Sequence, residues 1–232
     1  MSSARHEVLE RIRRALGADE RGHGNDIRPG EDRSGFSVPR EYRRRGTKGP
    51  RELLRLLHDR IVDYEATVLR CRPPELARAI AERLAARDAR KLVTPPDIPD
   101  AWMRECSRAG LEVLRDLAPG VLSNAQLAAC HAVLTGCVLA IGETGTLVLD
   151  GGATQGRRAL TLLPDYHLCV VFQHQVVETV PEAMEALWNT VRETRPPLTL
   201  ISGPSATSDI ELVRVEGVHG PRTLDVILVE DP

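Results

Sequence analysis

The chain has 232 residues, of which 42% are hydrophobic and 28% charged, and this composition suits one sizeable domain with or without an arm. Its net charge of −2 argues against a general affinity for nucleic acid. No apolar run reaches the ~18 residues that a membrane-spanning helix needs, and the chain does not begin with the apolar stretch of a signal peptide. We therefore expect a cytoplasmic protein without a membrane span.

The cysteines indicate reduced thiols and not a disulfide framework or a metal centre. There are five, at Cys71, Cys106, Cys130, Cys137 and Cys169, and no two form a Cys-x-x-Cys pair. We expect them to be buried, with no metal site and no iron–sulfur cluster held by this chain alone.

The charge is distributed unevenly along the chain. Residues 1–51 carry 13 Lys and Arg against 8 Asp and Glu, whereas residues 52–232 carry 18 against 25. A basic segment therefore precedes an acidic body. The run Arg43-Arg44-Arg45 is interpreted as a solvated basic linker, since no aromatic residues are interleaved with it as in a nucleic-acid-binding surface.

The first 50 residues predict a short helix followed by a flexible arm. Val8, Ile12 and Leu16 recur at helical spacing, and the residues after them are rich in Gly, Arg, Asp and Pro. A helix this short is marginal alone, so it packs either on the body of this chain or on a partner protein. We expect residues 1–50 to be dispensable for the folding of residues 51–232.

The body alternates helices with strands. Helices are expected from Pro50, over 74–87, over 100–109, from Ser123 to about Cys130 and over 181–191. Strands are expected at 66–71, 90–94, 111–114, 132–135, 146–149, 167–172, 198–202 and 224–229. This order predicts an α/β fold, with a mostly parallel sheet and helices on both of its faces.

Three loops of small, hydroxylated and charged residues stand out in the body. They are 143–146, 203–211 and 217–221. Ligands of open parallel sheets bind beyond the carboxyl ends of the strands, and the first two loops follow predicted strands. Each loop is equally compatible with a simple turn, and Asp209 with the N-cap of a helix.

Individual residues suggest two kinds of role in such a site. Glu143 is a candidate general base, or else a partner for backbone amides of its own turn. His219, between two glycines, is a candidate catalytic residue, or else binds loop carbonyls. Arg158, slightly favoured over Arg157, would hold a carboxylate or phosphate. The expected ligand-binding set of this small anionic-ligand pocket is Thr144, Gly145, Thr146, Arg158, Gly203, Ser205, Thr207 and Asp209.

The same residues resemble a known family. Ile141-Gly142-Glu143-Thr144-Gly145-Thr146, Gln155-Gly156-Arg157-Arg158, the run 203–211 and Gly217-Val218-His219-Gly220-Pro221-Arg222 are similar to the lactate-utilization protein C family, which carries the LUD domain. The resemblance extends over nearly the whole chain, including the ERIRRALG segment near its start. One departure is Ile141-Gly142, where the family more often has Ile-Ala.

The resemblance carries implications for fold and function. It implies a fold like that of the NagB/ribose-5-phosphate isomerase/CoA-transferase superfamily, which is related to 5-formyltetrahydrofolate cyclo-ligase. It also implies a part in oxidising L-lactate to pyruvate, beside two partner proteins with iron–sulfur features. Whether this chain is itself catalytic stays open.

A second class of function competes with this one. In it the chain is a stand-alone enzyme of the superfamily type, acting on a phosphorylated sugar, an acyl-CoA or a folate. Fold analogy alone does not decide between the two.

Overall fold

The computed structural model describes residues 7–11, 41–118, 120–208, 214–216 and 220–230. The chain divides into two compact units, Met1–Tyr42 and Arg43–Pro232. In the first unit residues 7–11 are helical, and the rest of the predicted helix lies outside the described residues. The second unit is the folded body, and it begins at Arg43, ahead of the boundary expected from the sequence.

Six strands of the body form one parallel sheet. Their spatial order is β1 (Thr67–Cys71), β12 (Thr223–Val229), β7 (Tyr166–Phe172), β4 (Ala132–Thr135), β2 (Lys91–Thr94) and β3 (Glu112–Arg115). Every neighbouring pair is parallel. The α/β fold class is therefore confirmed, and the apolar runs at 132–135 and 167–172 are strands at the centre of the sheet.

A second, smaller sheet was not expected. It contains four strands in the order β8 (Val176–Val177), β5 (Leu139–Ile141), β6 (Thr146–Leu149) and β9 (Thr199–Ile201). β6 is antiparallel to both β5 and β9. The strands predicted at 146–149 and 198–202 are present. They do not belong to the parallel sheet, because they are neighbours in the small sheet and pair with each other there.

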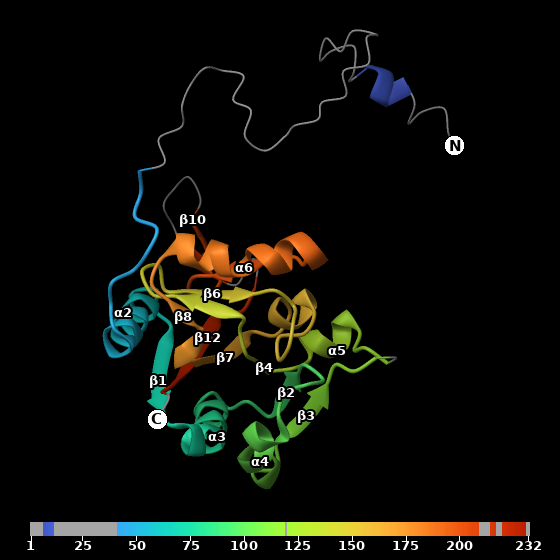
Figure 1. The fold of residues 1–232 in the computed structure, drawn as a ribbon. Helices are drawn as coiled ribbons and strands as arrows, with labels where there is room; N and C mark the ends of the chain where they lie inside the picture. The colour runs from blue at the N-terminus through green and yellow to red at the C-terminus, as the bar shows by residue number, and fades with distance from the viewer. Residues whose placement is uncertain (1–6, 12–40, 119, 209–213, 217–219, 231–232) are drawn as a thin grey trace. The chain divides into compact units, whose positions relative to one another are not determined.

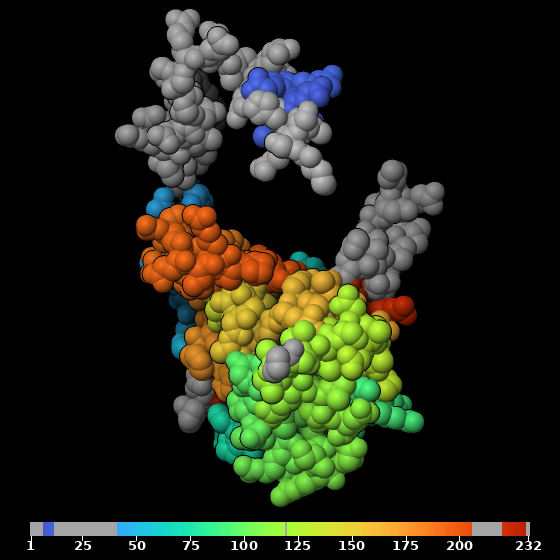
Figure 2. Space-filling view, turned by 90° about the vertical axis from the view of Figure 1, so that its right-hand side faces the viewer, coloured from blue at the N-terminus to red at the C-terminus, as the bar shows by residue number. Residues whose placement is uncertain are grey.

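The helices cover both faces of the parallel sheet (Figure 1). α3 (Leu76–Ala86) and α4 (Asp100–Arg108) pack on one face. On the other face lie α2 (Pro50–Asp63) and the small sheet, with α5 (Asn124–Ala128) beside them. α6 (Val180–Thr194) covers the outer side of the small sheet. In the space-filling view α6, in orange, and the green region from β2 to α5 lie at opposite ends of the body (Figure 2).

Capping residues set the starts of two helices, and one of them, Ser123, was expected from the sequence. Ser123 accepts a hydrogen bond from the backbone N–H of Gln126 at 3.3 Å and starts α5. Thr179 does the same for Glu182 at 3.3 Å and starts α6. None of the helices in the described part of the chain is long and apolar enough to cross a bilayer.

Two short strands are described in the run after β9. β10 (Ala206–Ser208) pairs antiparallel with β11 (Arg214–Glu216). A helix capped by Asp209, one of the alternatives for this run, does not extend to Arg214, because Arg214–Glu216 is a strand. Asp209 itself lies outside the described residues.

Candidate functional site

A cavity of about 190 Å³ lies between β9, the loop that follows it, and the first residues of β7 and β12. The polar side chains in its lining are those of Arg158, Thr161, His167, Thr199, Ser202 and Ser205, and Gly203 lines it as well. His167 and Leu224 are each the second residue of their strand. The cavity therefore lies at the amino edge of the parallel sheet, and the expectation of a site at the carboxyl edge does not hold for it. The reason is that β9 belongs to the small sheet and carries its loop to the opposite edge.

Arg158 brings a positive charge to this cavity. It lies in the 3₁₀ helix η2 (Arg158–Thr161), and its Nη1 donates to the carbonyl of Thr161 at 3.0 Å and to its Oγ1 at 2.8 Å. Within the described part of the chain no carboxylate lies within ion-pair distance of its guanidinium. Burial lowers the pKa of Arg158 from its usual value. The remaining guanidinium donors can bind a carboxylate or phosphate.

The neighbouring Arg157 has a structural role instead. Its Nε donates to Oδ2 of the buried Asp116 at 2.6 Å, and its Nη2 to Oδ1 at 3.1 Å. The hydrogen bond to Asp116 raises the pKa of Arg157. The two adjacent arginines thus separate into one that closes an ion pair and one that faces a cavity.

A chain of hydroxyl groups connects the cavity to the β5–β6 turn. Ser202 Oγ, in the cavity lining, lies 2.8 Å from Thr146 Oγ1, which lies 2.7 Å from Thr144 Oγ1. Thr144 and Thr146 therefore reach the site only through Ser202. At the other end of the loop the backbone N–H of Ser205 donates to the carbonyl of Pro221 at 2.8 Å and closes the cavity wall.

Two glycines of the predicted site are needed for close packing. Gly203 has φ +85°, and a Cβ there would lie 2.6 Å from Cβ of Tyr64. Gly145 has φ +61°, and a Cβ there would lie 2.8 Å from the backbone of Arg60. Gly203 lines the cavity, whereas Gly145 packs against the end of α2 and does not.

His167 was missed from the sequence. Its side chain is 1% exposed, lines the cavity, and has Nε2 at 2.8 Å from Thr135 Oγ1. The signal for it is a polar residue inside the apolar run Tyr166–Phe172. Such a residue needs a buried partner, and here Thr135 on β4 supplies it.

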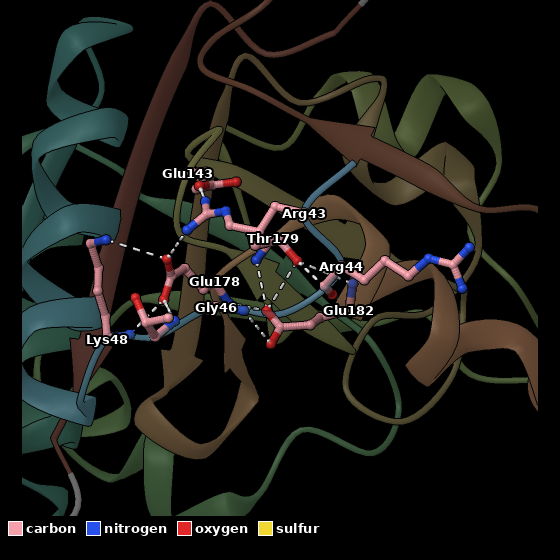
Figure 3. Close-up of polar contacts among 9 residues, drawn as sticks. Arg43, Arg44, Gly46, Lys48, Glu143, Glu178, Thr179 and Glu182 are labelled. Carbon is pink, nitrogen blue, oxygen red and sulfur yellow. Dashed lines mark hydrogen bonds and ion pairs between the residues drawn. The ribbon is translucent and has the colours of Figure 1, made fainter. Parts of the chain in front are cut away.

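Glu143, the candidate general base, lies in a different group of polar residues (Figure 3). It forms an ion pair with Arg43, and its backbone N–H donates to the carbonyl of Glu178 at 3.0 Å. It does not line the cavity. The structure thus brings Arg158, Gly203 and Ser205 together and places Glu143 against Arg43 and Glu178, away from the cavity.

Glu178 is the centre of the anchor of the segment that enters the body, and we define this anchor as residues 43–48 with Glu178 and Glu182. Its Oε2 accepts the backbone N–H groups of Thr47 and Lys48, each at 2.7 Å, and its Oε1 accepts Arg43 Nη1 at 2.9 Å (Figure 3). Glu182 accepts the backbone N–H of Gly46 at 3.0 Å. The hydrogen bond from the Lys48 backbone, with those from Thr47 and Arg43, lowers the pKa of Glu178 to about 2.

The remaining predicted residues cannot be placed in this way. Thr207 belongs to β10, and Asp209 and His219 lie outside the described residues.

The five thiols are all free and buried. Cys137 and Cys169 hydrogen-bond to each other, and this contact lowers the pKa of Cys169 and raises that of Cys137. Over the described ranges, no three His, Cys, Asp or Glu side chains are grouped so that they could hold a metal ion.

Comparisons with known proteins agree with the fold. The family model for the LUD domain matches residues 65–229. A lactate utilization protein C from Deinococcus radiodurans is 54% identical over 178 residues, covering 77% of this chain and 80% of that protein. Another from Bacillus velezensis is 24% identical over 239 residues, covering 96% of this chain and 94% of that protein.

A solved structure has a similar backbone fold. The crystal structure of a DUF162 family protein from Deinococcus radiodurans is 45% identical, with a TM-score of 0.67, and the match covers 79% of this chain and 99% of that chain. The family model spans β1 to β12, and therefore includes the parallel sheet, the small sheet and the cavity between them. By sequence and by fold, this chain belongs to the LUD-domain family.

Proposed function

We propose that this protein takes part in lactate utilization as one subunit of a three-protein system that oxidises L-lactate to pyruvate. In this proposal it supplies the cavity for the small carboxylate and docks to two partner subunits that hold the iron–sulfur clusters. The relatives named lactate utilization protein C support the pathway. The observation that carries the role of this chain is the cavity with Arg158 in its wall and no carboxylate paired with it in the described structure.

The size of the cavity suits a small acid. One water molecule needs only about 10–15 Å³ of cavity volume, so a cavity of about 190 Å³ has room for a three-carbon carboxylate. Arg158 would hold the carboxylate, and the lining hydroxyls offer further hydrogen bonds. A phosphorylated sugar, an acyl-CoA or a folate is larger, and would have to extend out of the cavity.

The chemistry requires an electron acceptor outside this chain. Conversion of lactate to pyruvate removes two electrons and two protons, one from the hydroxyl and one from carbon 2. Iron–sulfur clusters accept electrons and are held by clustered thiolates. The thiols here are buried and scattered. We therefore assign the clusters to the partner subunits.

The binding part of the proposal is tested by calorimetric titration of the full-length chain with L-lactate, pyruvate and propionate. Arg158→Met should abolish binding of all three. Arg78→Met, which removes an exposed arginine on α3, should leave binding unchanged. Equal affinity of the wild type and the Arg158→Met variant would overturn the assignment of the site.

The assembly part is tested by co-purification of the native protein and a lactate-dependent dye-reduction assay. Activity should require this chain together with both partner subunits, and should fall with Arg158→Met. Turnover of a phosphorylated sugar, acyl-CoA or folate by the isolated chain would instead establish the stand-alone enzyme.

A further inference from the structure

His167 is the side chain in the cavity wall whose role the proposed function leaves unassigned. We infer that His167, oriented by Thr135, recognises the oxygen at carbon 2 of the bound acid and so restricts the cavity to 2-hydroxy and 2-oxo monocarboxylates. This inference rests on the proposed function, because it assumes that Arg158 holds the carboxylate.

The position of the ring is fixed by its surroundings. His167 lies on β7, between β12 and β4, where Leu224 and Val133 are its partners in register. Its side chain is 1% exposed, and Thr135, which contacts Nε2 at 2.8 Å, is fully buried. A ring held between two strands and by one hydrogen bond is pre-organised to select a ligand.

The hydrogen bond to Thr135 uses one of the two ring nitrogens. A neutral imidazole has one donor and one acceptor nitrogen, and both are donors when it is charged. Nε2 is turned to Thr135, and Cys169 is a further hydrogen-bond partner of the ring. In this inference Nδ1 is the nitrogen that meets a ligand in the cavity that the ring lines. An oxygen at carbon 2 of the acid can form that hydrogen bond, whereas the methylene of propionate cannot.

Two hydroxyl groups of the wall, those of Thr161 and Ser202, are engaged within the protein. Thr161 Oγ1 accepts from Arg158 at 2.8 Å, and Ser202 Oγ bonds Thr146 Oγ1 at 2.8 Å. Of the described residues that line the cavity, His167 is the one imidazole. Because the ring is buried and held by Thr135, it is the group that we assign to distinguish an oxygen from a hydrogen at carbon 2.

The experiment compares affinities for L-lactate, pyruvate and propionate by calorimetric titration of the full-length protein. One hydrogen bond predicts that the wild type binds the first two about three- to tenfold more tightly than propionate. His167→Leu should bring this ratio to about one without changing the affinity for propionate, and His167→Gln should restore part of it. Thr135→Val should lower the ratio while keeping the shape of the core. Melting temperatures would identify any variant that does not fold.

The outcomes separate this inference from the proposed function. If Arg158→Met abolishes binding but His167→Leu and Thr135→Val keep the wild-type ratio, the role of His167 is wrong and the carboxylate site stands. The same conclusion follows if the wild-type protein binds lactate and propionate equally. If the wild type binds none of the three acids, both proposals fail.

Discussion

At the scale of single residues, Glu178 shows how one buried carboxylate can determine where a domain begins. Its side chain is 3% exposed and accepts hydrogen bonds from Arg43, Thr47 and Lys48. None of these donors belongs to a helix or strand, so the segment has no other regular structure to order it. The carboxylate therefore takes the place of a secondary-structure partner for the backbone of residues 47 and 48.

The first prediction concerns the pH dependence that Glu178 contributes. Because the pKa of Glu178 falls to about 2 in the folded state, its stabilisation is complete above the unfolded value of about 4.3 and is lost as the pH falls toward 2. Glu178→Gln should cost about 2 kcal/mol of unfolding free energy at pH 7 and progressively less below pH 4. Urea denaturation at several pH values measures this. Glu185→Gln, at an ion pair whose carboxylate is 63% exposed, is the matched control and should change little.

The second prediction separates backbone strain from steric overlap at two glycines. Gly145 and Gly110 both have positive φ, at 61° and 71°. A Cβ at Gly145 would lie 2.8 Å from the backbone of Arg60, whereas nothing lies within 4 Å of one at Gly110. Gly110→Ala should therefore cost about 1 kcal/mol and Gly145→Ala about 2–3 kcal/mol. Equal losses in chemical denaturation would show that the turn moves away from α2 at no cost.

The residues of the candidate site could be predicted only in part. Arg158 is predictable because an arginine pair after a glycine-rich run indicates anion binding, and the structure turns it to the cavity. Glu143 fits the same kind of argument, but its partner Arg43 is a hundred residues earlier in the chain and no local pattern connects the two. The pattern around His167 indicates only a core strand. An apolar run predicts that a strand is buried, but it does not predict the hydrogen bond that allows a histidine to be buried in it.

At the scale of elements, local sequence patterns identified the longer strands and missed the short ones and their pairing. The central parallel strands β4 and β7 were found because each is a buried apolar run bounded by turn residues. β5 and β8 have three and two residues, which is too short for any periodicity to show. The orientation of β9 depends on its pairing with β6, which lies about fifty residues away, and a strand pattern does not specify its partner.

The third prediction concerns the anchor as an element. Deleting residues 1–42 removes only the first unit and should leave the stability of the body unchanged. Deleting residues 1–48 removes the donors Arg43, Thr47 and Lys48 and uncovers Glu178, and should cost about 2 kcal/mol or more. This changes the expectation that all of residues 1–50 are dispensable. The two truncated proteins are compared by thermal and urea denaturation.

A double change provides the control for this truncation. In the protein lacking residues 1–48 the carboxylate has lost these donors and is open to water, so Glu178→Gln should change the stability little. The same substitution in the protein lacking residues 1–42 should instead destabilise it. If Glu178→Gln destabilised both proteins equally, the cost of the longer deletion would come from lost packing and not from the carboxylate.

At the scale of the whole molecule, the layers explain why every thiol is buried. Cys106 lies between α3 and α4 and the parallel sheet, and Cys130 lies beside α5. Cys137 and Cys169 lie between the parallel sheet and the small sheet. Cys71 ends β1, an edge strand, and is 8% exposed. Four of the five positions are therefore closed by elements on both sides, and reaching them requires those elements to separate.

The fourth prediction is that the thiols report the unfolding of the body. In native protein at pH 7, an aromatic disulfide reagent should modify none of the five thiols promptly, and all five should react in about 6 M guanidinium. Burial raises the pKa of Cys71 to about 11, so its thiolate fraction is small as well. Under prolonged exposure Cys71 should react first, through fraying of the edge strand, and Cys71→Ser should remove that phase. The other four should react together, at the rate of global unfolding. Prompt reaction of Cys137 or Cys169 in the native state would contradict this, because it would require the two sheets to separate locally next to the cavity that His167 lines.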